Sequence, residues 1–166
     1  TNYNIASVSV GKLTVTESAA EIVVTTTGGT FTYDGQPHGA TVEVSELPEG
    51  YTLQTAESDA TATDVTTEAV TADADRLVIV NAAGVDVTAN LNITYNSGTI
   101  KITPKTATVT TDSAEKVYDG TPLTASGRIE GLVKGENVTL TMTGTQTVKG
   151  ESANTYELTW NRNAVS

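Results

Sequence analysis

The chain has 166 residues and no cysteine, and its 20 acidic and 9 basic residues give a formal net charge of −11 at pH 7. The absence of thiols excludes disulfides and thiolate metal sites, and the negative charge disfavours nucleic acid and anionic membranes as partners. Thr occurs 33 times and Val 19 times; both are β-branched and suit a pleated sheet, which predicts an all-β fold. No apolar run approaches the ~20 residues of a membrane-spanning helix.

The first predicted strand covers residues 2–15, within the sequence TNYNIASVSVGKLTV. A similar sequence, NLNITYNSGTIKIT, occurs at residues 90–103, where Ile100 and Ile102 correspond to Leu13 and Val15. The later copy closes the unit that precedes it, so we expect residues 2–15 to close a neighbouring unit rather than the one that follows them. The apolar residues of this inter-unit strand are Ile5, Val8, Val10, Leu13 and Val15.

Residues 17–104 form the first predicted domain. Apolar residues alternate with polar ones at residues 42–44, 51–53 and 85–87, which is typical of half-buried strands. Residues 77–80 are continuously apolar and predict a central strand that is buried on both faces. Residues 56–76 are rich in Ala, Thr and Asp and lack a strong apolar stripe, so they are compatible with strands, a loop or one short helix.

Residues 105–166 form the second predicted domain, with alternating strands around residues 107–109, 138–142 and 156–160. This domain reaches Ser166 without a closing strand of the 90–103 type. Joining Ser166 to Thr1 restores that strand, so we expect one period of a longer array, or a subunit whose first strand completes a neighbour. Residues 1–16, the closing strand of a preceding or neighbouring unit, should then project from the body or pair with residues 154–161 of another copy.

Two short motifs punctuate the chain 85 residues apart, Tyr33-Asp34-Gly35-Gln36-Pro37 and Tyr118-Asp119-Gly120-Thr121-Pro122. In such a motif Asp accepts a hydrogen bond from the backbone two residues on, Gly adopts a positive φ and Pro ends a strand. One structural corner in each of two domains explains the duplication better than a catalytic motif does. We expect both tyrosine rings to be at least half buried, in equivalent surroundings. The corner residues are Tyr33, Asp34, Gly35, Tyr118, Asp119 and Gly120.

Further features accompany the second corner, namely residues 118–123, 131–133, 135 and 143–147, with Asn2, Tyr3, Ile5, Gly11 and Leu13. On these features the chain resembles the YDG/MBG-type extracellular repeats of large bacterial cell-surface proteins, strongly in the second domain and loosely in the first. The first domain departs from the pattern, because Gln36 and His38 stand where the second has Thr and Leu, and because its middle is longer and acidic. The resemblance implies an all-β module in the stalk or fibre of a protein on the bacterial surface, with no catalytic residues.

Three groups of residues are candidate sites of chemistry. His38, the single histidine, follows Pro37 without an evident catalytic partner, which favours an exposed turn residue. The acidic residues between 57 and 75 lack the register of a calcium-binding loop and favour a solvated loop. Tyr156 and Trp160 share one face with Leu158, which favours packing over a sugar-stacking platform. The acidic residues in question are Glu57, Asp59, Asp64, Asp73 and Asp75.

The sequence therefore predicts a non-enzymatic module without cofactor or metal, built from two tandem Ig-like β-sandwich domains. A β-grasp-like fold with one short helix at residues 65–75 is the alternative. We expect an extracellular location on a bacterial cell surface and head-to-tail contact with copies of itself, by strand complementation or by tandem repetition. The alternative function is an adhesin domain that binds glycans or another host ligand.

Overall fold

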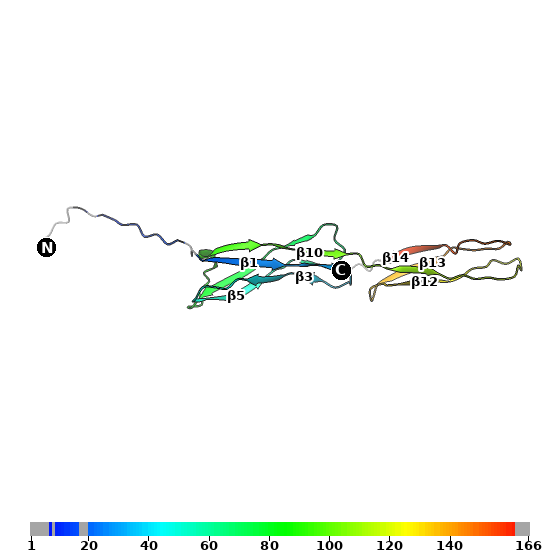
Figure 1. Ribbon diagram of the computed structural model, residues 1–166, viewed down its shortest axis with the longest axis horizontal. Coiled ribbons are helices and arrows are strands. Elements are labelled where there is room, and N and C mark those ends of the chain that lie inside the picture. Colours follow the sequence, from blue (N-terminus) through cyan, green and yellow to red (C-terminus); the bar gives the residue numbers. More distant parts are fainter. Residues whose placement is uncertain (1–6, 8, 17–19, 162–166) are drawn as a thin grey trace. The chain divides into compact units, whose positions relative to one another are not determined.

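The computed structural model of this protein describes residues 7, 9–16 and 20–161 (Figure 1). The fold is almost entirely β, which confirms the all-β prediction. The described residues form small sheets, and their one helical element is a 3-10 turn, η1 (Thr88–Asn90). No helix in this part of the chain is long and apolar enough to cross a membrane.

The alternative with a short helix at residues 65–75 is wrong. That stretch contains the strand β7 (Val70–Ala72) between irregular segments. Pairing of β7 with β10 buries Ala72 completely, whereas a helix of this length with only Val and Ala as apolar residues would be marginal in water.

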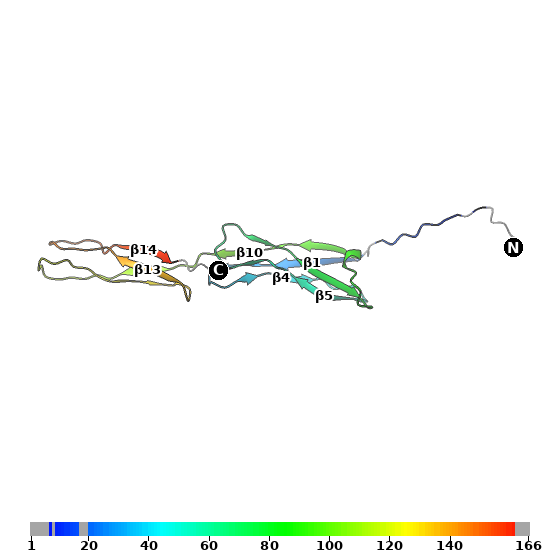
Figure 2. The ribbon, with the colours of Figure 1, turned by 180° about the vertical axis from the view of Figure 1, so that it is seen from behind.

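The strand β1 (Glu21–Thr27) is the centre of a three-stranded sheet. It pairs antiparallel with β4 (Thr41–Val44) and parallel with β9 (Asn92–Asn96), and Figure 2 shows β4 beside it. Because side chains alternate along a strand, one face of β1 is buried, with Ile22 and Val24 fully inside. The parallel pair joins segments that lie far apart in the sequence.

The strands β5 (Tyr51–Glu57) and β8 (Arg76–Asn81) form an antiparallel pair. The other edge of β8 is covered by the turn that follows it, since Asn81 N–H donates to Val85 O over 3.0 Å. The prediction of a strand buried on both faces at residues 77–80 is wrong, because Ile79 is the one fully buried residue there. Ile79 packs with Ile22 and Leu91 in a hydrophobic cluster.

The strand β10 (Gly98–Thr103) lies between β2 (Gly29–Thr32) and β7 in a second three-stranded sheet. Its alternate residues Ile100 and Ile102 are 0% exposed. A Cβ added at Gly98 would lie 2.4 Å from the backbone O of Thr26, so only glycine fits where the chain crosses β1. A short pair joins β3 (His38–Gly39) to β6 (Thr61–Ala62).

The later part of the chain forms two antiparallel pairs. One joins β11 (Thr108–Thr111) to β12 (Gly127–Glu130), and the other joins β13 (Asn137–Met142) to β14 (Tyr156–Asn161). Between residues 104 and 160 no described residue is fully buried, in contrast to the earlier strands. The four later strands thus leave their apolar faces incompletely covered.

The structure contains an internal repeat at the same 85-residue shift that separates Tyr33 from Tyr118. Under this shift β1 and β4 correspond to β11 and β12, and the register is unchanged: Val24 opposes Val44 as Val109 opposes Ile129. The loop after each pair also matches. Gly50 and Gly135 have φ of 88° and 95°, and the residue after each donates its backbone N–H three residues back, Tyr51 to Pro48 and Glu136 to Val133.

Contacts divide the chain into two compact units. One holds the described residues up to Gly29 with Gly39–Thr61 and Val70–Ile100. The other holds Thr30–His38 and Ala62–Ala69 with the described residues from Lys101 onward. The first corner is therefore grouped with the residues of the second predicted domain. The domain limits 17–104 and 105–166 stay a prediction.

Candidate functional site

The first corner has the turn that its motif predicts. Gln36 N–H donates to the Asp34 carboxylate over 2.9 Å, and Gly35 has a φ of 74°. The backbone N–H of Tyr33 donates to Thr103 O over 2.8 Å, which ties the corner to the end of β10. The Gln36 N–H, and after it the His38 ring, hold the pKa of Asp34 below its ordinary value, because both stabilise the charged form.

His38 belongs to this corner, and the expectation of an exposed histidine without partners is wrong. Its ring stacks on Phe31 with centroids 4.1 Å apart, and its Nε2 lies 3.0 Å from the Asp34 carboxylate. The side chain is 20% exposed. Asp34 thus bonds both the turn and the imidazole.

The first corner also contacts the loop of the later repeat. The Tyr33 hydroxyl donates to the Glu136 carboxylate, and this hydrogen bond raises the pKa of Tyr33 because it favours the protonated phenol. A Cβ at Gly35 would lie 3.0 Å from Val133 Cγ1. No pattern in the sequence pairs residue 33 with residue 136, so sequence reasoning missed this contact.

The second corner has the same turn but different surroundings. Thr121 N–H donates to Asp119 over 2.9 Å, and Gly120 has a φ of 78°. The Lys116 ammonium, 2.8 Å from the Asp119 carboxylate, is the main reason that the pKa of Asp119 lies far below its ordinary value. Tyr118 is 69% exposed, so the expectation that its ring is half buried is wrong. The end of β10 lies beside Tyr33, but no described residue takes the equivalent place beside Tyr118.

The described residues of the inter-unit strand are exposed to solvent. Val10 is 89% exposed, Leu13 99% and Val15 98%, and residues 9–16 belong to no strand. This agrees with the expectation that the segment is not part of the core of the domain that follows it. Ile5 and Val8 lie outside the described residues.

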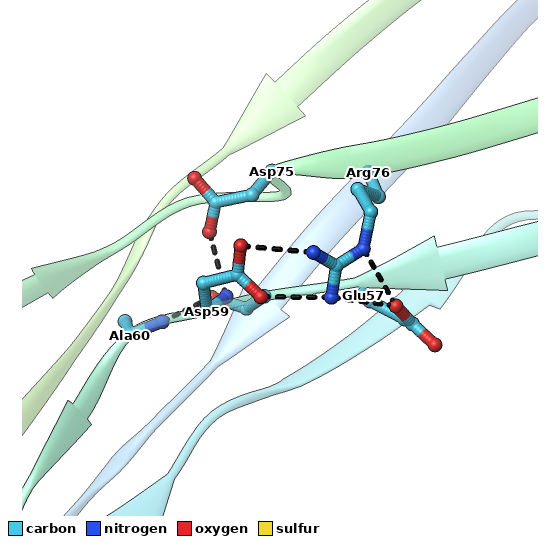
Figure 3. A network of polar contacts seen from close by, with 6 residues as sticks. Glu57, Asp59, Ala60, Asp75 and Arg76 are labelled. Carbon is cyan, nitrogen blue, oxygen red and sulfur yellow. Dashed lines mark hydrogen bonds and ion pairs between the residues drawn. The ribbon is translucent and has the colours of Figure 1, made fainter.

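Three of the acidic residues between 57 and 75 lie beside Arg76, namely Glu57, Asp59 and Asp75 (Figure 3). The Arg76 guanidinium donates to the Glu57 carboxylate over 2.8 Å and to both oxygens of Asp59 over 2.8 and 3.0 Å. Asp75 accepts the backbone N–H of Asp59 over 2.7 Å. The two acidic neighbours, Glu57 first, raise the pKa of Arg76. Within the described residues no three metal-ligating side chains gather. The geometry is that of a cross-strand clamp between β5 and β8.

The two late aromatic residues lie on one face of the β13–β14 pair. Cross-strand pairing sets Trp160 opposite Val138 and Tyr156 opposite Met142, and the two rings are 59% and 44% exposed. Exposed aromatic rings are the feature that a sugar-binding surface needs. Their partners on this face are apolar rather than hydrogen-bonding, which suits packing against another protein segment.

An open groove of about 430 Å³ runs beside the end of β11. It is lined by residues 111–114, 123–125, 144–146 and 152–154. Asn154 donates its side-chain amide to Asp112 O and Ser126 O, over 2.9 and 3.1 Å, while its Oδ1 is buried without a described hydrogen-bond partner. The Asn154 amide thus ties the end of β11 to Ser126 beside the groove.

Comparisons with protein-family models, with curated protein sequences and with solved structures find no match to this chain.

Proposed function

We propose that this chain is a non-enzymatic structural repeat module in the fibre or adhesin stalk of a bacterial cell surface. Copies of it contact one another head to tail, and length comes from repetition. In arrays of this kind each unit contacts its neighbours, so stability is a sum of unit and interface contributions.

The observation that carries the proposal is the internal repeat. One backbone arrangement occurs twice at a shift of 85 residues, with the same register, the same Asx-turn corner and the same loop glycine. The earlier copy has buried side chains and the later copy has none among its described residues. A unit in this state gains stability from a neighbour that covers it.

The charge and the cysteine content are compatible with the proposed location. A net charge of −11 keeps a surface protein soluble, and the absence of cysteine does not imply a cytoplasmic protein. His38 has a turn carboxylate and a phenyl ring as neighbours, so the proposal gives it a structural role.

Glycan binding is the second candidate, because the exposure of Trp160 and Tyr156 favours it. A glycan array separates the two functions: an adhesin domain binds a defined glycan and loses that binding when Trp160→Ala removes the ring. The stalk function requires no such ligand.

Small-angle scattering tests the proposed function. One, two and three copies are joined, with Ser166 of each copy followed by Thr1 of the next. A stalk module gives a maximum dimension that grows by a constant increment with each copy. Growth with about the 0.38 power of chain length, as for a single compact body, would contradict the proposal.

A further inference from the structure

The internal repeat identifies an unfilled strand position beside β11. In the earlier copy β1 lies between β4 and β9. In the later copy β11 takes the place of β1 and pairs with β12, but no described strand takes the place of β9.

The backbone groups that face this position follow from the ladder. Asp112 N–H donates to Ser126 O over 2.8 Å, which directs the N–H of Asp112 toward the β12 side. Because direction alternates along a strand, Val109 and Thr111 turn their N–H and C=O away from β12. Their equivalents in β1 are Val24 and Thr26, which face β9 by the same rule.

The groove beside β11 corresponds to the position of β10. Residues 111–113 are equivalent to residues 26–28, over which β10 crosses closely: a Cβ at Gly28 would lie 2.1 Å from Thr99 O. At the far end of β10, Thr103 accepts the Tyr33 N–H, and its hydroxyl donates to Phe31 O over 3.0 Å. Tyr33 and Phe31, which bind this end of β10, are equivalent to Tyr118 and Lys116 in the later repeat.

The outer edge of β14, where the sequence predicts the partner strand, is a different position. Its counterpart in the earlier copy is β8, whose outer edge is covered by the local turn at residues 85–88. Neither β9 nor β10 pairs with β8.

The segment that fits the unfilled position is present in the sequence. Residues 11–16 align with residues 98–103, so that Leu13 and Val15 correspond to Ile100 and Ile102. The first two are 99% and 98% exposed, and the second two are 0% exposed. The same sequence pattern is thus buried in the protein at residues 98–103 and exposed to water at residues 11–16.

We infer that residues 2–16 of a second molecule of this protein bind the later repeat of this chain. They lie beside β11 and continue through the groove. Residues before Gly11 pair in parallel with β11, at Val109 and Thr111. Gly11 crosses where residues 111–113 line the groove, and Thr16 O accepts the Tyr118 N–H. This inference rests on the proposed function and names the acceptor surface of its head-to-tail contact.

Hydrogen exchange on a completed chain tests the inference. A second copy of residues 1–16 is appended after Ser166, and the original segment carries Leu13→Asp and Val15→Asp so that only the appended copy can bind. The matched control carries the same two substitutions in the appended copy as well. We expect amide exchange at Val109, Thr111 and Tyr118 to slow by about tenfold or more relative to the control.

Self-association provides the second readout. The unmodified chain should associate as its concentration rises in sedimentation velocity, whereas the completed chain stays monomeric because its acceptor is occupied. Slower amide exchange at Tyr156, Leu158 and Trp160, without slower exchange at Val109 and Thr111, would overturn the inference. It would leave the proposed head-to-tail function standing. No protection at either edge would also overturn it, while constant growth of the joined copies would still support the proposed function.

Discussion

Ile102 and Val15 occupy aligned positions with opposite exposure, so truncating each to Ala should give very different results. Ile102→Ala removes a fully buried side chain. The lost carbons correspond to about 2.4 kcal/mol at ~0.8 kcal/mol per methylene, and the cavity left behind raises the loss in unfolding free energy to ~3–4 kcal/mol. Val15 is 98% exposed, so Val15→Ala should change the unfolding free energy by less than ~0.5 kcal/mol.

Urea unfolding followed by circular dichroism measures both variants, and thermal unfolding checks them. For a unit of this size the loss at Ile102 should lower the melting temperature by roughly 12–30 °C. Equal effects of the two substitutions, or a loss below ~1 kcal/mol for Ile102→Ala, would refute the claim that the aligned segments differ in burial.

Three further outcomes follow from the structure. Gly98→Ala should destabilise the fold because its Cβ would lie 2.4 Å from a backbone oxygen of β1, while Gly11→Ala, with nothing within 4 Å, should not; equal melting temperatures would contradict this. Because the pKa of Asp119 is lowered in the folded chain, Asp119 stabilises the fold at any pH above ~3.9, the ordinary pKa of Asp, and this stabilisation is lost as the pH falls through the lower folded pKa. An NMR titration of Asp119 with a midpoint of about 3.9, with Lys116 intact, would count against the corner geometry. A chelator should leave the melting temperature unchanged, since the Glu57 and Asp59 carboxylates already bind the Arg76 guanidinium, and a fall of many degrees would point to bound metal.

Much of the local structure could be predicted from the sequence. Period-2 alternation and β-branched composition predict strands, and Asp-Gly followed by Pro predicts a turn with a positive φ at Gly35 and Gly120. These features depend on a few neighbouring residues. The 85-residue repeat of the motif also indicated the repeat that the β-sheet register shows.

The long-range contacts could not be predicted in the same way. The parallel pairing of β1 with β9 joins segments about seventy residues apart, and no local pattern specifies which strand takes that edge. The exposure of Tyr118 depends on whether a strand lies beside it, so an identical motif gives two environments. The stacking of His38 on Phe31 likewise depends on where the corner folds back.

Unfolding of one chain and of two joined copies tests the central claim most directly. The single chain should show a transition of low stability from residues 105–161, because none of the described side chains there is fully buried. In two joined copies the second copy supplies residues 2–16 to the first, so the amplitude of this transition per copy should fall by about half, and the lost amplitude should reappear at higher temperature. Unfolding curves that superimpose per copy would contradict the account.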